Sequence, residues 1–326
     1  MINSSAEEIK CNAPTNYEPF EPNKWKEKNY STVMTPWEGQ YVVFLTITQD
    51  FDYVVMARFI NILNMGWKLY ENLVGQSPNP YRQYNNKVII AAIPDDNLTC
   101  GKGCGWIGST GIEICGFYKE DYTLFSNQAN DFPHYYFYEM GRNYFIFSDK
   151  HSIFTTGFAV FMRYVCMDYI KLDDPELELR KYIESTESKI KFLELDFLQI
   201  FTDKAGLSEK QNRLNDQRFS SDQNVMYASV MLKLRQDYGG NDWVKHFFHY
   251  LSLCPYASPK TEKGVFIQCM NWLVSASCAA RQNLSQLFTE RWKMQIDANN
   301  QKVLNEFDWI STDLQPSLII DLLQFR

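Results

Sequence analysis

The hydrophobic pattern of the chain changes its period near residue 131. Before that point, residues 41–47 and 87–93 are β-branched apolar runs, and residues 55–73 between them carry apolar side chains at helical spacing. This order predicts a strand, helix, strand unit. After that point, helical spacing recurs over residues 132–147, 153–170, 176–203, 221–238, 241–252, 262–281 and 297–307. Strands followed by helices are typical of an α+β fold.

A glycine-rich segment, CGKGCGWIGSTGIEICGF, separates the two parts of the sequence at residues 100–117. Extended patterns on both sides of a turn predict a hairpin at the edge of the sheet. Its glycines match neither phosphate-loop spacing, which disfavours a nucleotide site. We therefore divide the chain into an N-terminal arm over residues 1–36, a sheet-containing subdomain over 37–130 and a helical subdomain over 131–326.

Composition sets the outer limits of this plan. A chain of 326 residues with 45% hydrophobic and 16% aromatic content can bury one large core or two packed subdomains. Its formal charge of -7 without long runs of one sign disfavours nucleic acid as a partner. We also expect no membrane span, because no stretch approaches roughly 20 apolar residues. The start of the sequence lacks a signal-peptide pattern, so we expect a cytoplasmic protein if this N-terminus is native and a secreted one if it is trimmed.

Cysteine and histidine spacing leaves alternatives open. Cys100, Cys104 and Cys115 could form a zinc knot, but they lack a paired C-x-x-C pattern and a fourth ligand. A disulfide between two of them and three free thiols are the other readings. His246 and His249 are spaced for one metal on a predicted helix, but without carboxylates at matching spacing we interpret them as ordinary helix residues.

Two consecutive predicted helices carry the informative residues. Residues 132–147 read FPHYYFYEMGRNYFIF, and residues 153–164 read IFTTGFAVFMRY. The YEMGRN segment resembles the H-E-x-G-H-x pattern of gluzincin zinc metallopeptidases, most closely their enhancin-like and plant basic-secretory-protein-like members. In this family the helix supplies two zinc histidines at i and i+4, and the glutamate between them acts as general base. A second helix supplies the third ligand.

Three further segments are similar to the same family in the same order. TTGFAVFMRY resembles its pattern of glutamate, glycine, any residue and alanine followed by an aromatic-rich turn. GCGWIGSTGIEI is similar to its substrate-binding edge strand, and LFTERWKM to its closing helix motif. The resemblance covers roughly residues 37–295. It implies a gluzincin catalytic fold, in which a small mixed β-sheet with an edge hairpin precedes a mainly helical subdomain.

The resemblance also implies that the zinc ligands have been lost. Tyr138 and Arg142 stand at the two histidine positions, Thr156 stands at the third-ligand glutamate, and only Glu139 is retained. Arginine offers no lone pair, tyrosine must first lose a proton with a pKa near 10, and threonine is a poor zinc ligand. We therefore expect no metal and no cofactor at these positions.

Glu139 and Arg142 lie three residues apart on one helix face, which allows two readings of equal weight. They could form an ion pair that replaces the charge of zinc and holds the site folded. Alternatively, Tyr138, Glu139 and Arg142 could line a cleft as proton donor, proton acceptor and anion clamp.

Other residues are candidates for contact with a ligand. His134 lies four residues before Tyr138 on the same face, so a shifted metal site that uses it is a further alternative. His151, between the two helices, is a minor candidate for the same role. The ligand-binding candidates are His134, Tyr135, Trp106, Ile107, Gly108 and Thr156.

The sequence thus predicts a metallopeptidase-like protein that lacks the zinc ligands and binds a peptide or small ligand in the inherited cleft. The first alternative is a repurposed enzyme that uses Glu139 as general base together with Tyr138 or Arg142. The second is an active metallopeptidase with unusual ligands.

Overall fold

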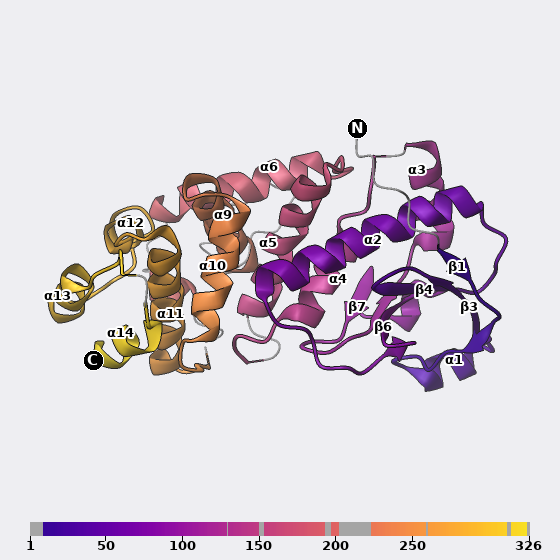
Figure 1. The fold of residues 1–326 in the computed structure, drawn as a ribbon, viewed down its shortest axis with the longest axis horizontal. Helices are drawn as coiled ribbons and strands as arrows, with labels where there is room; N and C mark the ends of the chain where they lie inside the picture. Colours follow the sequence, from indigo (N-terminus) through magenta and orange to yellow (C-terminus); the bar gives the residue numbers. More distant parts are fainter. Residues whose placement is uncertain are drawn as a thin grey trace. The chain divides into compact units, whose positions relative to one another are not determined.

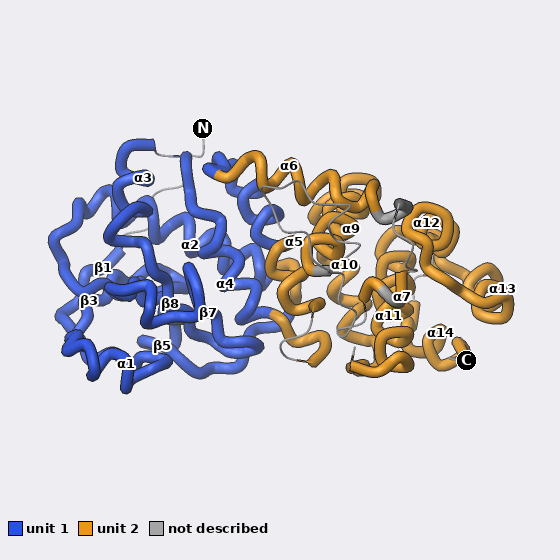
Figure 2. The backbone as a smooth tube through the Cα atoms, turned by 180° about the vertical axis from the view of Figure 1, so that it is seen from behind, with its two compact units in different colours: residues 1–71, 76–144, 162–175 blue, residues 72–75, 145–161, 176–326 orange. Residues whose placement is uncertain are grey.

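A computed structural model describes residues 9–128, 130–149, 153–192, 197–201, 223–258, 260–311 and 314–324. The chain forms two compact units, coloured in Figure 2. Unit 1 holds residues 1–71, 76–144 and 162–175, and unit 2 holds residues 72–75, 145–161 and 176–326. This division differs from the predicted boundaries at 37 and 131. The N-terminal segment and the helix that carries Glu139 both belong to unit 1.

Unit 1 is built on a mixed sheet, which confirms the predicted α+β class. The main strand order is β1-β3-β4-β6-β8-β7, with β2 paired to β3 and β5 to β6. Strands β4, β6 and β8 are parallel, whereas β7 pairs antiparallel with β8 at the sheet edge. The predicted edge hairpin is therefore confirmed. The strands are β1 Lys10–Cys11, β2 Thr15–Asn16, β3 Val33–Glu38, β4 Val42–Thr46, β5 Gln83–Tyr84, β6 Lys87–Ala92, β7 Gly103–Gly105 and β8 Ile112–Ile114.

Helices α2 and α4 pack on one face of this sheet. The α2 helix, Tyr53–Val74, lies between β4 and β6 in the sequence, as predicted, and above these strands in Figure 1. On this face the Phe44 ring lies 5.2 Å from Phe59 of α2 and 6.3 Å from Tyr136 of α4. Any side chain on Gly66 of α2 would collide with the Phe137 ring of α4, so glycine lets the two helices approach closely.

The N-terminal segment covers the opposite face of the sheet. Tyr17 and Trp25 are buried there against alternate residues of β4 and β6, including Val43, Leu45 and Ile89. The sequence predicted an arm laid on the surface, because strands of two residues with polar side chains leave no readable period. Helix α1, Pro22–Glu27, carries Trp25 into this second core, on the opposite side of the sheet from α2 in Figure 1.

Four further elements belong to unit 1. The 3₁₀ helix η1 Asp96–Leu98 lies between β6 and β7. The π-helix η2 Phe117–Asp121, α3 Tyr122–Asn127 and α4 Tyr135–Tyr144 follow β8. In the part of the chain that the structure describes, no helix is long and apolar enough to cross a membrane.

Unit 2 is helical. Its longest buried helix, α11, begins after Thr261, whose hydroxyl oxygen accepts the N–H of Gly264 at 3.0 Å, and ends at Arg281 in the left-handed region. The predicted helices after residue 153 are confirmed, except that 176–203 is interrupted and residues 193–196 and 202–203 lie outside the described chain. The helices are α5 Ile153–Ile170, which continues into unit 1, α6 Leu177–Thr186, η3 Glu187–Phe192, α7 Phe197–Ile200, α9 Gln223–Asp237, α10 Asn241–Ser252, α11 Glu262–Ala280, α12 Ser285–Glu290, α13 Ala298–Glu306 and α14 Pro316–Leu322.

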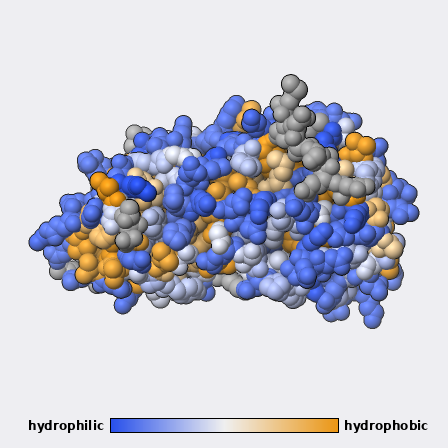
Figure 3. Space-filling model, in the orientation of Figure 1, coloured by the Kyte–Doolittle hydropathy of each residue, from blue (hydrophilic) through white to orange (hydrophobic). Residues whose placement is uncertain are grey.

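The surface of the molecule is mainly hydrophilic in Figure 3. Hydrophobic residues gather over the part that holds α13 and α14, where Ile310, Leu318 and Leu322 are exposed. His246 and His249 are also exposed, on α10, in agreement with their interpretation as ordinary helix residues.

Candidate functional site

Strand β7 and helix α4 approach each other so closely that glycine is required on the strand. A Cβ on Gly103 would lie 2.8 Å from Cγ of Glu139. A Cβ on Gly105 would collide with the backbone carbonyl of Glu139 and lie 2.9 Å from Cβ of Arg142. The alternating glycines of the hairpin therefore serve this contact.

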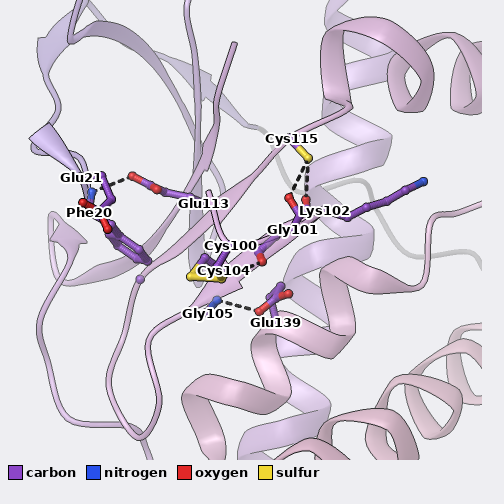
Figure 4. The surroundings of a disulfide bond; sticks show 12 residues. Phe20, Glu21, Cys100, Gly101, Lys102, Cys104, Gly105, Glu113, Cys115 and Glu139 are labelled. Atoms are coloured by element: carbon purple, nitrogen blue, oxygen red, sulfur yellow. Dashed lines mark hydrogen bonds between the residues drawn. A yellow bond between two sulfur atoms is a disulfide. The ribbon is translucent and has the colours of Figure 1, made fainter. Parts of the chain in front are cut away.

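Glu139 binds the backbone of the edge strand. The Gly105 N–H donates to Oε2 of Glu139 at 2.6 Å (Figure 4). The Cys115 N–H donates to the Lys102 carbonyl, and the Trp106 N–H donates to the Gly111 carbonyl. In an antiparallel pair the residues that bond the neighbouring strand alternate with residues that do not, so Gly103 and Gly105 are of the second kind. The Gly105 N–H consequently points away from β8, and the Glu139 carboxylate occupies the outer side of the strand there.

Burial sets the protonation behaviour of Glu139. The residue is 5% exposed, and loss of hydration raises the pKa of its carboxyl to about 7. The charge of Arg142 and the hydrogen bond from Gly105 oppose this rise without cancelling it. An ion pair between Glu139 and Arg142 was one of the two readings of the sequence. In the structure the charge of Arg142 acts on Glu139, and the strand backbone is a second partner. Near neutral pH this carboxyl is poised to exchange a proton.

Asn143 fastens the hairpin turn to α4. Its Nδ2 donates to the carbonyls of Trp106 at 2.9 Å and Gly111 at 3.0 Å, and the Gly108 N–H donates to the Arg142 carbonyl at 3.1 Å. Asn143 was not predicted as a site residue, although a polar residue four positions after Glu139 lies on the same helix face and was a usable signal in the sequence.

Asn143→Ala is expected to lower the free energy of unfolding by about 2 kcal/mol, because two buried carbonyls would lose their donor. The measurement is urea denaturation of both proteins. Asn283→Ala serves as control, since Asn283 makes a comparable bond to the Leu304 carbonyl at a half-buried position of unit 2. Equal losses in the two variants would contradict the anchoring role of Asn143.

The turn residues proposed as ligand contacts differ in their exposure. Trp106 is 40% exposed and packs its ring 5.5 Å from Phe20 and 4.7 Å from Tyr81. Ile107 is buried, and Gly108 has a φ of 71° and donates its N–H to α4. Trp106 is therefore the member of this group that offers a surface to a ligand.

The N-terminal end of α4 is held by a buried carboxylate. The hydroxyls of Tyr135 and Tyr136 both donate to Oδ2 of Asp121 in the π-helix, and burial raises the pKa of all three groups. His134 is buried directly before α4, with its ring centroid 6.1 Å from that of Tyr164. Tyr135 thus contributes its hydroxyl to the fold at this end of the helix.

The remaining predicted residues lie in different parts of the chain. Tyr138 is half-buried on α4 beside Glu139, whereas Thr156 is half-buried on α5 in unit 2. His151 lies outside the described residues. Within the described ranges, no group of three or more histidine, cysteine, aspartate or glutamate side chains could hold a metal ion.

A disulfide joins Cys100 to Cys104 and closes the loop that enters β7 (Figure 4). Cys115 is a free thiol whose sulfur lies 3.2 Å from the Gly101 carbonyl and 3.1 Å from the Lys102 carbonyl. Burial raises the pKa of this thiol to about 11, so it remains protonated. Of the three readings of these cysteines, the structure has the disulfide.

Comparison with known proteins bears on the fold alone. No family model matches the chain, and no curated protein is significantly similar to it. A crystal structure of a functionally unknown conserved protein from Bacillus anthracis str. Ames is similar over 90% of this chain, with a TM-score of 0.51 and 11% identity. A mutant of a functionally unknown conserved protein from the same organism matches 87% of the chain, with a TM-score of 0.51 and 12% identity. The chain spans 58% and 55% of the lengths of these two proteins.

Proposed function

We propose that this chain is a metallopeptidase-like protein without zinc ligands that binds a peptide in extended form along β7, beside Glu139. The observation that carries the proposal is the Gly105 N–H, which points away from β8 and is held by a carboxylate of the chain itself. The proposal requires that a peptide carbonyl displace the Glu139 carboxylate and accept this N–H in its place, since both groups are hydrogen-bond acceptors. Addition of a strand to a sheet edge is a general mode of peptide recognition.

The arrangement of elements supports the resemblance to gluzincins. An antiparallel edge strand precedes a helix that places its glutamate against that strand. The order is the one expected if YEMGRN corresponds to the zinc-binding helix. Tyr138 and Arg142, which stand at the histidine positions, remain unsuited to zinc for the chemical reasons given above.

Selection from a displayed library of random octapeptides against the whole chain tests the proposal. We expect peptides that bind at micromolar concentration, and we expect Trp106→Ala to weaken them about tenfold, because the contact with an exposed indole would be lost. Tyr256→Ala is the matched control, since Tyr256 is an exposed aromatic residue of unit 2. A library that yields no binder, or binders insensitive to Trp106→Ala, contradicts peptide binding at this edge.

A second candidate is an enzyme that uses Glu139 as general base. The pKa of about 7 favours it, because proton transfer is most effective when the pKa of the base lies near the working pH. In this case Arg142 would clamp an anionic group of the substrate. Turnover of a panel of small esters and amides that is absent in Glu139→Gln would support the enzyme over the binding protein.

A further inference from the structure

A small hollow lies in unit 1 at the turn between β3 and β4, near the opposite end of the strand order from β7. Its volume is about 230 Å³, and its polar lining includes Lys10, Glu38, Asn61, Asn64 and Lys87. This volume is close to that of about eight water molecules in the liquid, which suits a ligand of a few heavy atoms.

Asn64 is a buried amide residue in the lining of this hollow. Its Oδ1 accepts the N–H of Tyr41 at 2.9 Å and of Val42 at 3.2 Å, so the carbonyl side of the amide is fixed by two donors. Asn64 is 5% exposed, and its Nδ2 has no hydrogen-bond acceptor among the described residues.

Gly39 keeps the space next to this amide open. A Cβ at Gly39 would lie 2.6 Å from Nδ2 of Asn64, so any side chain there would block the amide. Because a buried N–H group without an acceptor costs about 1–3 kcal/mol, the Asn64 amide calls for an acceptor from outside the protein.

The charges around the hollow favour a single negative charge. Lys87 Nζ donates to Oε1 of Glu38 and to the Gly39 carbonyl, both at 2.7 Å, which leaves its third N–H for another acceptor. Asn12 donates to the second oxygen of Glu38 at 2.7 Å, so that carboxylate is occupied. With Lys10 exposed at the rim, the three charged side chains sum to one positive charge.

We infer that this hollow is a binding site for a small carboxylate. One carboxylate oxygen accepts an N–H of the Asn64 amide, and the other accepts the third N–H of Lys87. A monoanion would neutralise the single positive charge of the lining, whereas a phosphate dianion would leave the site with an uncompensated negative charge. The site is independent of the function proposed for β7.

Acetate titration of protein labelled with ¹⁵N-glycine tests the inference, since the chain holds 15 glycines and Gly39 lines the hollow. The Gly39 amide resonance is expected to shift saturably with sodium acetate at pH 7.5, and not with sodium chloride at equal ionic strength. Inorganic phosphate should bind more weakly than acetate. Absence of a saturable shift, or tighter binding of phosphate, would overturn the assignment.

Asn64→Asp is the decisive variant, because its carboxylate still accepts the N–H groups of Tyr41 and Val42 but presents an acceptor in place of the donor. Acetate affinity is expected to fall at least about tenfold. Asn127→Asp adds the same charge at an exposed position of α3 and should leave the affinity unchanged. Lys10→Met, at the exposed rim, tests the charge without touching the buried amide and should also weaken acetate. Unchanged affinity in both Asn64→Asp and Lys10→Met would place the acetate elsewhere.

Discussion

Glu139→Gln is expected to remove a decline in the free energy of unfolding of about 3 kcal/mol that the wild type undergoes as the pH rises to about 7. Burial raises the pKa of Glu139 from 4.5 to about 7, so the folded state keeps its proton over an interval in which the unfolded state releases it. In the wild type, each pH unit of that interval lowers the free energy of unfolding by about 1.4 kcal/mol. Glutamine carries no charge at any pH and can still accept the Gly105 N–H, so the variant lacks this decline.

Urea denaturation at pH 4, 5, 6, 7 and 8 provides the measurement. The variant should gain stability relative to the wild type as the pH rises, with most of the gain between pH 5 and 7. Glu113 and Asp121 also have raised pKa values through burial, but both proteins contain them, so the difference between the two curves isolates Glu139. Parallel curves would show that the Glu139 carboxyl ionises at an ordinary pKa.

Arg291→Met is expected to lower the free energy of unfolding by about 3 kcal/mol. Arg291 donates to the two carboxylate oxygens of Glu187 at 2.8 and 2.6 Å, and Trp292 Nε1 donates to the same group at 3.0 Å. Glu187 is 5% exposed, so removal of the guanidinium leaves a buried carboxylate without its cation. The expected loss of stability is at the lower end of the range of about 3–5 kcal/mol for buried ion pairs, because the Arg291 side chain is 41% exposed.

The double variant Arg291→Met with Glu187→Met separates the cost of a stranded charge from the loss of packing. It should recover part of the stability, because no buried charge remains. Burial acts to raise the pKa of Glu187, but the hydrogen bonds from Arg291 and Trp292 outweigh it, so the pKa lies below its usual value. The stability given by the pair is thus lost as the pH falls through the folded pKa, and the single variant should approach the wild type in acid. A single variant as stable as the wild type at pH 7 would contradict the prediction.

The parts of the fold that were predicted from the sequence are those whose apolar residues recur at a regular spacing. The β4, α2, β6 unit and the long helices were predicted from apolar runs and helical spacing, and the edge hairpin from its glycines. The N-terminal segment escaped prediction because it joins the sheet through strands of two residues and buries isolated aromatics such as Trp25. Its place depends on the tertiary core, which no local pattern encodes.

The candidate site was predicted in part. Glu139 and Arg142 were singled out by the resemblance of YEMGRN to the zinc-binding helix of gluzincins, and their possible pairing followed from their spacing on one helix face. The bond from Gly105 to Glu139 joins residues 34 apart in the sequence, and neither residue indicates the other by type. Asn143 showed a usable signal as a polar residue in an apolar helix, but its two acceptors on the hairpin became visible only with the fold.

The bond between Glu139 and Gly105 also protects the sheet against self-association. An edge strand exposes backbone groups that can pair with another copy of the chain, and natural proteins block this with charges and short strands. Here β7 has only three residues, and a carboxylate occupies the outward N–H at Gly105. Protonation of Glu139 below neutral pH would leave the outward N–H bonded to a neutral carboxyl, which is a weaker acceptor than a carboxylate.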